Sequence, residues 1–137
     1  MNFRSFRESK MELRVVRRQP EIHLAIVGCR SFTNQEVFNY HMTEWMKVYG
    51  LPGQVISGGA AGADTLGEQW AQKYGIPLTV LKPDWTAHGK GAGIRRNTDI
   101  VLAATHVLAF PSRQSRGTRD SIRKAQQYGR ILQVVEI

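Results

Sequence analysis

The sequence has little cysteine, few acidic residues and no long apolar run. Its one cysteine, Cys29, cannot form an internal disulfide, which favours a buried structural thiol and a reducing compartment. No segment approaches the roughly 20 apolar residues of a membrane span, and no signal-peptide core follows the N-terminus. The 137 residues suffice for one hydrophobic core but are too few for two ordinary domains. We therefore predict a single globular domain in the cytoplasm.

Basic residues outnumber acidic ones, 19 against 11, which gives a formal net charge of +8. Half of this excess lies in residues 1–20, where six Arg or Lys side chains stand against two Glu. Because Pro20 precedes the first strand-like run, we expect a basic arm at 1–20 and a folded domain at 21–137. The arm could bind nucleic acid, or it could be a solvated tail or pack on another subunit.

Short apolar runs alternate with helix-like segments from residue 21 onward, which is the pattern of successive β-α-β units. The predicted strands are residues 21–28, 54–57, 76–81, 105–110 and 131–135. The predicted helices are residues 33–49, 63–74, 97–104 and 117–128, and segment 82–97 is predicted as a long polar loop. Parallel strands joined by helices stack into layers. We predict a Rossmann-like three-layer α/β sandwich with a five-stranded parallel sheet in the order 3-2-1-4-5.

Local chemistry predicts how the first helix begins, ends and packs. Thr33 and Glu36 are spaced as a capping box, and Gly50 with Pro52 stops the helix. Apolar or aromatic side chains recur at three- to four-residue steps, and we expect this stripe to face the sheet. It consists of Val37, Tyr40, His41, Trp45 and Val48.

The stretch Ser57-Gly58-Gly59-Ala60-Ala61-Gly62-Ala63-Asp64 connects a predicted strand to a predicted helix. Residues without bulky side chains let backbone N–H groups approach an anion at the positive end of a helix. The spacing fits neither the Walker A motif nor the dinucleotide motif G-x-G-x-x-G. The stretch is therefore either a phosphate-binding turn or only a tight connection. Asp64 could accept a ribose hydroxyl or bind a cation, or it could simply be favoured by the helix dipole.

Three further loops join this turn at the carboxyl edge of the predicted sheet, where ligands bind in such folds. They are residues 28–32, 82–97 and 111–118. The last contains a second Gly-containing turn, residues 115–118, so two such turns could hold the two ends of one ligand. In the polar segment, Trp85 could stack on a base or fill the core. Lys90, Arg95 and Arg96 could neutralise phosphate or simply be solvated.

Two other kinds of site are disfavoured by the sequence. His88 has no second His, Cys or carboxylate at metal-ligand spacing, so we predict no metal site. Ser57 lacks an evident histidine base, and no nucleophile elbow occurs, which disfavours acyl transfer of the triad type.

The chain resembles the YspA-like, cpYpsA-related family of the SLOG superfamily over about residues 22–137. The resemblance rests on an ordered set of motifs: Gly28-Cys29-Arg30-Ser31-Phe32, Ser57 to Asp64, Pro83-Asp84-Trp85, Gly89-Lys90 with Ala92-Gly93, Arg96-Asn97, and Ser115-x-Gly117-Thr118. SLOG relatives include the Lonely Guy phosphoribohydrolases and the DNA-processing protein A family. The resemblance implies a Rossmann-like domain that binds nucleotides, nucleotide-derived ligands or nucleic acid.

The resemblance also defines an enzymatic alternative. The phosphoribohydrolases carry a catalytic Glu where this chain has Ser121, and Asp120 lies one residue earlier. A shift of one helical position turns a side chain by about 100°. If the chain cleaves a nucleotide N-glycosidic bond, the candidate acids are Asp64, Asp84 and Asp120.

From these patterns we predict a small-molecule nucleotide ligand, for example NAD or ADP-ribose, and a homo-oligomer. A protein that binds single-stranded DNA, similar to DNA-processing protein A, is the other alternative. The predicted binding residues are Gly28, Arg30, Phe32, Ser57, Gly58, Gly59, Ala60, Gly62, Ala63, Asp64, Trp85, Lys90, Gly93, Arg96, Asn97, Ser115, Gly117 and Thr118.

Overall fold

The computed structural model describes residues 17–137. Its strands are β1 (Arg18–Gly28), β2 (Leu51–Ser57), β3 (Leu78–Val80), β4 (His106–Phe110) and β5 (Ile131–Val134). Its helices are α2 (Gln35–Tyr49), α3 (Ala63–Lys73), α4 (Trp85–His88), α5 (Ala92–Ala103) and α6 (Arg116–Gln127), with a 3₁₀ turn, η1 (Gly89–Gly91), between α4 and α5. Each predicted strand is present, although β3 is shorter than expected.

The strands form one parallel sheet in the order β3-β2-β1-β4-β5, which confirms the predicted topology. In the middle strand, Leu24 is paired with Val55 of β2 on one side and with His106 of β4 on the other. The residues from Leu24 to Val27 are all buried because helices cover both faces of the sheet.

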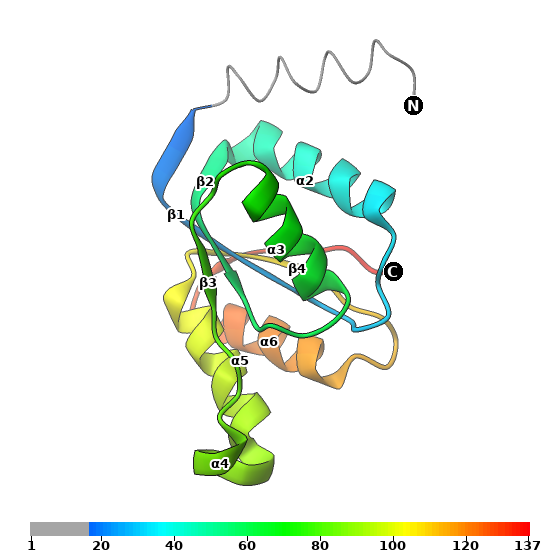
Figure 1. Ribbon diagram of the computed structural model, residues 1–137, viewed down its shortest axis with the longest axis vertical. Coiled ribbons are helices and arrows are strands. Elements are labelled where there is room, and N and C mark those ends of the chain that lie inside the picture. The colour runs from blue at the N-terminus through cyan, green and yellow to red at the C-terminus, as the bar shows by residue number, and fades with distance from the viewer. Residues whose placement is uncertain (1–16) are drawn as a thin grey trace.

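Helices α2 and α3 cover one face of the sheet, and α5 and α6 cover the other (Figure 1). The alternation of side chains along β1 divides the core into two clusters. Leu24 and Ile26 pack with side chains of α2 and α3, whereas Ala25 and Val27 pack with those of α5 and α6. The result is the predicted three-layer sandwich.

Helix α2 packs through a different face from the one predicted. Its buried side chains are Phe38, Met42, Trp45 and Met46. Of the predicted stripe, Val37, Tyr40 and Val48 are exposed and Trp45 alone is buried. Since α2 carries apolar residues on two faces, periodicity could not choose between them. The cap is also displaced by one residue: the Asn34 side chain, and not Thr33, accepts the N–H of Val37.

Several predicted boundaries differ in the structure; β2, for example, begins at Leu51 and not at residue 54. Segment 82–97 is largely helical, because α4, η1 and the first half of α5 lie within it. Strand β1 begins at Arg18, and Arg18 and Gln19 pair with Leu51 and Pro52 of β2. The last residues of the predicted arm are therefore part of the sheet, while residues 1–16 lie outside the described residues. Within the described part of the chain, no helix has the length and apolar character to cross a membrane.

Candidate functional site

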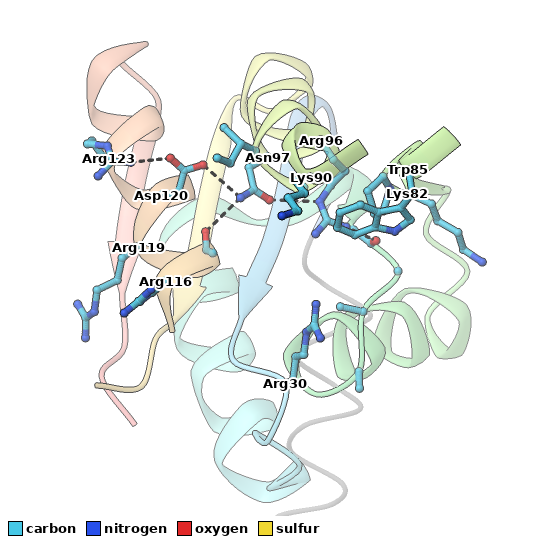
Figure 2. Close-up of a pocket in the computed structure, with 18 of the residues that line it drawn as sticks. Arg30, Lys82, Trp85, Lys90, Arg96, Asn97, Arg116, Arg119, Asp120 and Arg123 are labelled. Carbon is cyan, nitrogen blue, oxygen red and sulfur yellow. Dashed lines mark hydrogen bonds and ion pairs between the residues drawn. The ribbon is translucent and has the colours of Figure 1, made fainter. Parts of the chain in front are cut away.

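Loops that follow β1, β2, β3 and β4 line two adjoining cavities at the carboxyl edge of the sheet. The larger cavity has a volume of about 960 Å³, and Figure 2 shows most of its lining. The smaller has a volume of about 450 Å³. The two share Arg30, Ala60, Arg96, Asn97, Arg116 and Gly117. Both cavities therefore lie at the edge of the sheet where the strand order predicts a ligand site.

The larger cavity is strongly cationic. Within the described residues its lining contains eight Arg or Lys side chains and one carboxylate, Asp120. The cationic residues are Arg30, Lys82, Lys90, Arg96, Arg113, Arg116, Arg119 and Arg123. In Figure 2, Arg30 approaches the opening from the side opposite Lys90 and Arg96. Such a concentration of one sign of charge in a concave surface attracts anions.

The smaller cavity has a different lining, rich in hydroxyl groups. It is formed between the loop after β1, the start of α3 and the loop before α6. Its polar residues include Ser31, Asp64, Ser112, Ser115, Thr118 and Ser121. Gly28 also lines it.

The first Gly-rich turn is held tightly by its own neighbours. Ser57 is fully buried; its Oγ donates to Glu68 Oε2 at 3.0 Å and accepts the N–H of Gly59 at 3.1 Å. The N–H of Ala60 donates to Asp64 Oδ2 at 3.2 Å. The N–H of Ala63 donates to the Cys29 carbonyl at 3.3 Å. These three backbone donors, which the sequence suggested for phosphate, are therefore engaged within the chain.

Asp64 is a buried carboxyl with an altered affinity for protons. Burial raises its pKa to about 6, although the Ala60 N–H and the nearby Arg96 guanidinium act in the opposite direction. Its side chain is 6% exposed and lines the smaller cavity. It can thus exchange a proton near neutral pH.

A chain of hydrogen bonds joins α6, α5 and the first turn (Figure 2). Asp120 Oδ2 accepts from Asn97 Nδ2 at 3.2 Å, and Asn97 Oδ1 accepts from Arg96 Nε at 3.2 Å. Arg96 Nη1 donates to the Gly58 carbonyl at 2.6 Å. Asn97 Nδ2 also donates to the Gly117 carbonyl at 3.3 Å. Asp120 completes the chain through ion pairs with Lys124 and Arg123 at 2.9 and 2.6 Å.

The second Gly-containing turn opens α6, and the N–H groups of Ser115 and Arg116 donate to the Ser112 and Gln114 carbonyls. Ser115 Oγ accepts the N–H of Ser112, which fixes the loop before the helix. The first backbone bond of α6 runs from the Arg119 N–H to the Ser115 carbonyl. The amides of Gly117 and Thr118 precede that bond, in the part of a helix whose N–H groups have no intrahelical acceptor. They are therefore suited to an anion.

Trp85 and Lys90 lie on the short α4–η1 projection at the rim of the larger cavity (Figures 1 and 2). The Trp85 indole is 57% exposed and is not part of the core. Gly93 lies beneath it, since a Cβ there would be 3.7 Å from Trp85 Cη2. An exposed indole at a cationic rim can stack on a base.

Several predicted site residues lie outside both cavities. Phe32 is a core residue whose ring stacks on Phe110 with a centroid distance of 5.0 Å. Asp84 is exposed and caps α4 by accepting the N–H of Ala87. Ser57, Gly62 and Ala63 are buried behind the turn and support it. The three candidate acids are separated, with Asp64 on the smaller cavity and Asp120 on the larger.

Five cationic residues of the larger cavity were not among the predicted binding residues, although the first three lie in loops predicted at this edge: Lys82, Arg113, Arg116, Arg119 and Arg123. Three lie on α6 at positions i, i+3 and i+7, a spacing that indicates one face of a helix. The sequence showed this periodicity, but it did not show that the face borders a cavity.

No group of three His, Cys, Asp or Glu side chains that could hold a metal ion occurs among residues 17–137. His88 is exposed at the end of α4. Cys29 is buried beside the smaller cavity and lies 3.4 Å from Ser31 Oγ. Burial raises the pKa of its thiol. Several hydrogen bonds, the strongest of them with Ser31, lower the pKa by a larger amount, so the pKa is below its ordinary value.

The chain is a Rossmann-like domain with a cationic cavity at the carboxyl edge of its sheet. The model of the family described as YspA, cpYpsA-related SLOG matches residues 23–88. The Gene 61 protein of Mycobacterium phage D29 is 41% identical over 87 residues, which cover 59% of this chain and 68% of that protein. The chain belongs to the YspA, cpYpsA-related SLOG family.

Two solved structures of DNA processing protein A share the fold. The Streptococcus pneumoniae protein matches with a TM-score of 0.65 and 17% identity over 82% of this chain. The Helicobacter pylori protein, whose structure concerns single-stranded DNA binding, matches with a TM-score of 0.61 and 20% identity over 90% of this chain. The chain spans 50% of the first protein and 67% of the second. At these identities the likeness shows the fold alone.

Proposed function

We propose that this chain binds a phosphate-bearing ligand of the nucleotide class in the larger cavity. The observation that carries the proposal is the charge of the lining, eight cationic side chains against one carboxylate within residues 17–137. That carboxylate, Asp120, is already paired with Lys124 and Arg123. The cavity therefore offers a large excess of positive charge that a ligand can neutralise.

The parts of a nucleotide match separate parts of the larger cavity and of the smaller cavity that adjoins it. The open amides of Gly117 and Thr118, with the adjacent Arg116, are suited to phosphate. Trp85 offers a flat exposed surface for a base. The hydroxyl-rich smaller cavity, reached past Arg30 and Arg96, is suited to a sugar. The volume of about 960 Å³ is at the upper end of ordinary ligand pockets, which favours a ligand as large as ADP-ribose.

A charge reversal with a matched control tests the proposal. Arg116 and Arg95 are both exposed, but Arg116 lines the cavity and Arg95 does not. We expect isothermal titration to detect binding of ADP-ribose or ATP. Arg116→Glu should weaken this binding roughly tenfold or more, because it replaces an attractive charge with a repulsive one. Arg95→Glu, which changes the net charge equally, should weaken it about twofold at most.

Adenosine serves as the ligand control, since it lacks phosphate and should bind weakly or not at all. Absence of binding for AMP, ATP, NAD and ADP-ribose would contradict the proposal. Equal loss of binding in Arg116→Glu and Arg95→Glu would show that only the overall charge matters.

Single-stranded DNA is a second candidate ligand, favoured by the row of Arg116, Arg119 and Arg123 along α6. These residues border the cavity on one side (Figure 2), and neighbours at this helical spacing lie about 5–6 Å apart. Successive phosphates of a strand could follow such a row. The structural likeness to a protein studied for single-stranded DNA binding is consistent with this candidate.

The dependence of affinity on oligonucleotide length and on salt concentration distinguishes single-stranded DNA from a nucleotide as the ligand. A strand-binding protein should bind longer oligothymidylates more tightly and lose affinity steeply between roughly 50 and 200 mM salt. Fluorescence anisotropy measures both effects. Deletion of residues 1–16 tests the proposed basic arm without disturbing β1, which begins at Arg18. If affinity is independent of oligonucleotide length and salt, the DNA candidate is wrong.

A further inference from the structure

We propose that Asp120 is a positioning residue that sets the orientation of the Arg96 guanidinium in the ligand cavity. The inference rests on the proposed function, because it assigns a role in the same anion site. Asp120 does not reach Arg96 itself. It acts through the Asn97 amide, whose nitrogen donates to Asp120 and whose oxygen accepts from Arg96.

The geometry leaves Asn97 a single favourable orientation. Its Nδ2 donates to both Asp120 Oδ2 and the Gly117 carbonyl, so the amide nitrogen must point towards α6. The amide oxygen then points towards Arg96 and accepts its Nε–H. Without an acceptor at position 120, the amide nitrogen keeps only its contact with the Gly117 carbonyl, so the orientation of the amide is less firmly fixed.

The orientation of Arg96 matters for both cavities, since this side chain lines each of them. Its Nε and Nη1 are bound to Asn97 and to the Gly58 carbonyl. Among residues 17–137, no hydrogen bond engages its Nη2. The guanidinium is thus held through two of its three nitrogens, and its remaining N–H groups are available to a ligand.

Asp120 is in turn held firmly and kept ionised. Burial raises its pKa, but the hydrogen bonds from Lys124 and Asn97 more than reverse this, and the pKa is below its ordinary value. The Asp120 and Lys124 side chains are only 12% and 14% exposed. A carboxylate of this kind is a poor proton donor, which favours a positioning role over that of a general acid.

Electrostatics and positioning predict opposite results when Asp120 is removed. A carboxylate in the lining repels an anionic ligand, so its loss should tighten binding if charge alone mattered. If Asp120 positions Arg96, the same loss should weaken binding in spite of the added positive charge. The sign of the change in affinity therefore separates the two roles.

The test compares Asp120→Ala, Asp120→Asn and Asp99→Ala with the wild type, using ADP-ribose in isothermal titration. We expect Asp120→Ala to weaken binding roughly tenfold, because a hydrogen bond in a charged network is lost. Asp120→Asn keeps an acceptor for Asn97 and should stay within about threefold of the wild type. Asp99 is an exposed carboxylate on α5 outside the cavity, so Asp99→Ala should change affinity by less than about twofold.

A measurement without ligand keeps this inference separate from the proposed function. The Arg96 Nε–H signal in an NMR spectrum should shift and broaden in Asp120→Ala and recover in Asp120→Asn. If Asp120→Ala does not fold, Asp120→Ser, whose side chain is too short to reach Asn97, replaces it. An unchanged Arg96 signal, or binding as tight as that of the wild type, would overturn the inference. Failure of wild-type protein to bind any nucleotide would instead overturn the proposed function.

Discussion

The two Gly-containing turns at the carboxyl edge are similar in sequence but have different surroundings. In residues 57–64 the glycines are surrounded by the chain itself, and Gly62 has a φ of 80° with the Cys29 and Arg30 carbonyls close by. At Gly117 an added Cβ would meet nothing within 4 Å. The first turn needs glycine for folding, whereas the second has open space that a ligand can occupy.

The two turns also differ in whether their backbone N–H groups already have acceptors within the chain. The N–H groups of Gly59 and Ala60 are engaged by Ser57 and Asp64. Those of Gly117 and Thr118 come before the first backbone bond of α6. We infer that the first turn supports the site and the second contacts the anion.

The largest expected effect is on stability, at Gly62. Gly62→Ala places a Cβ within 2.5 Å of the Arg30 carbonyl oxygen and requires a left-handed backbone. We expect a loss of about 3 kcal/mol or more in the free energy of unfolding, measured by urea denaturation. A loss below about 1 kcal/mol would show that the first turn can relax and that the proposed contrast is wrong.

The next largest effect concerns the pH dependence of stability through Asp64. Because burial raises its pKa from 3.8 to about 6, the folded state holds this proton more tightly than the unfolded chain. The favourable contribution of this proton to the free energy of unfolding is fully present below about pH 4. It is lost as the pH rises through about 6, which lowers the free energy of unfolding by about 2–3 kcal/mol.

Asp64→Asn removes this titration and keeps an oxygen for the Ala60 N–H. We therefore expect the variant to gain about 2–3 kcal/mol relative to the wild type between about pH 4 and pH 7.5. Urea denaturation at both values measures the difference. The window lies above the range in which Asp120 titrates, since the pKa of Asp120 is lowered. Parallel pH profiles for the two proteins would contradict the assignment.

The smallest effect on stability is expected at Gly117. Gly117→Ala adds a methyl group in open space within the first turn of α6 and should be neutral or stabilise by up to about 1 kcal/mol. The same methyl group should weaken ADP-ribose binding several-fold, because it occupies the approach to the anion. Thermal denaturation and isothermal titration of one sample give both values. Unchanged affinity would indicate that the ligand does not contact this turn.

The sequence predicted the sheet order because five apolar runs alternate with helices and leave few topologies open. It did not predict the packing face of α2, since Val37, Tyr40 and Val48 form as regular a stripe as the buried residues. The sequence predicted a loop at residues 82–97 because the segment is polar and rich in glycine, yet Gly93 lies within α5.

For the candidate site, too, the sequence predicted some residues and could not predict others. The positions of Arg30, Asp64 and Asn97 at the carboxyl edge follow from strand order, which the sequence supplied. The contributions of Arg119 and Arg123 depend on how α6 packs beside α5, and this is a tertiary property. Phe32 was expected to contact ligand, but its ring fills the core against Phe110, because a short loop after β1 turns it inward.

The most direct test of the central claim is a map of backbone amide shifts, by ¹H–¹⁵N NMR, on addition of ADP-ribose. We predict the largest shifts at Arg116, Gly117 and Thr118, smaller shifts in residues 58–60, and none on the outer faces of α2 and α3. Absence of shifts at millimolar ligand, or shifts centred on α2 and α3, would contradict the account.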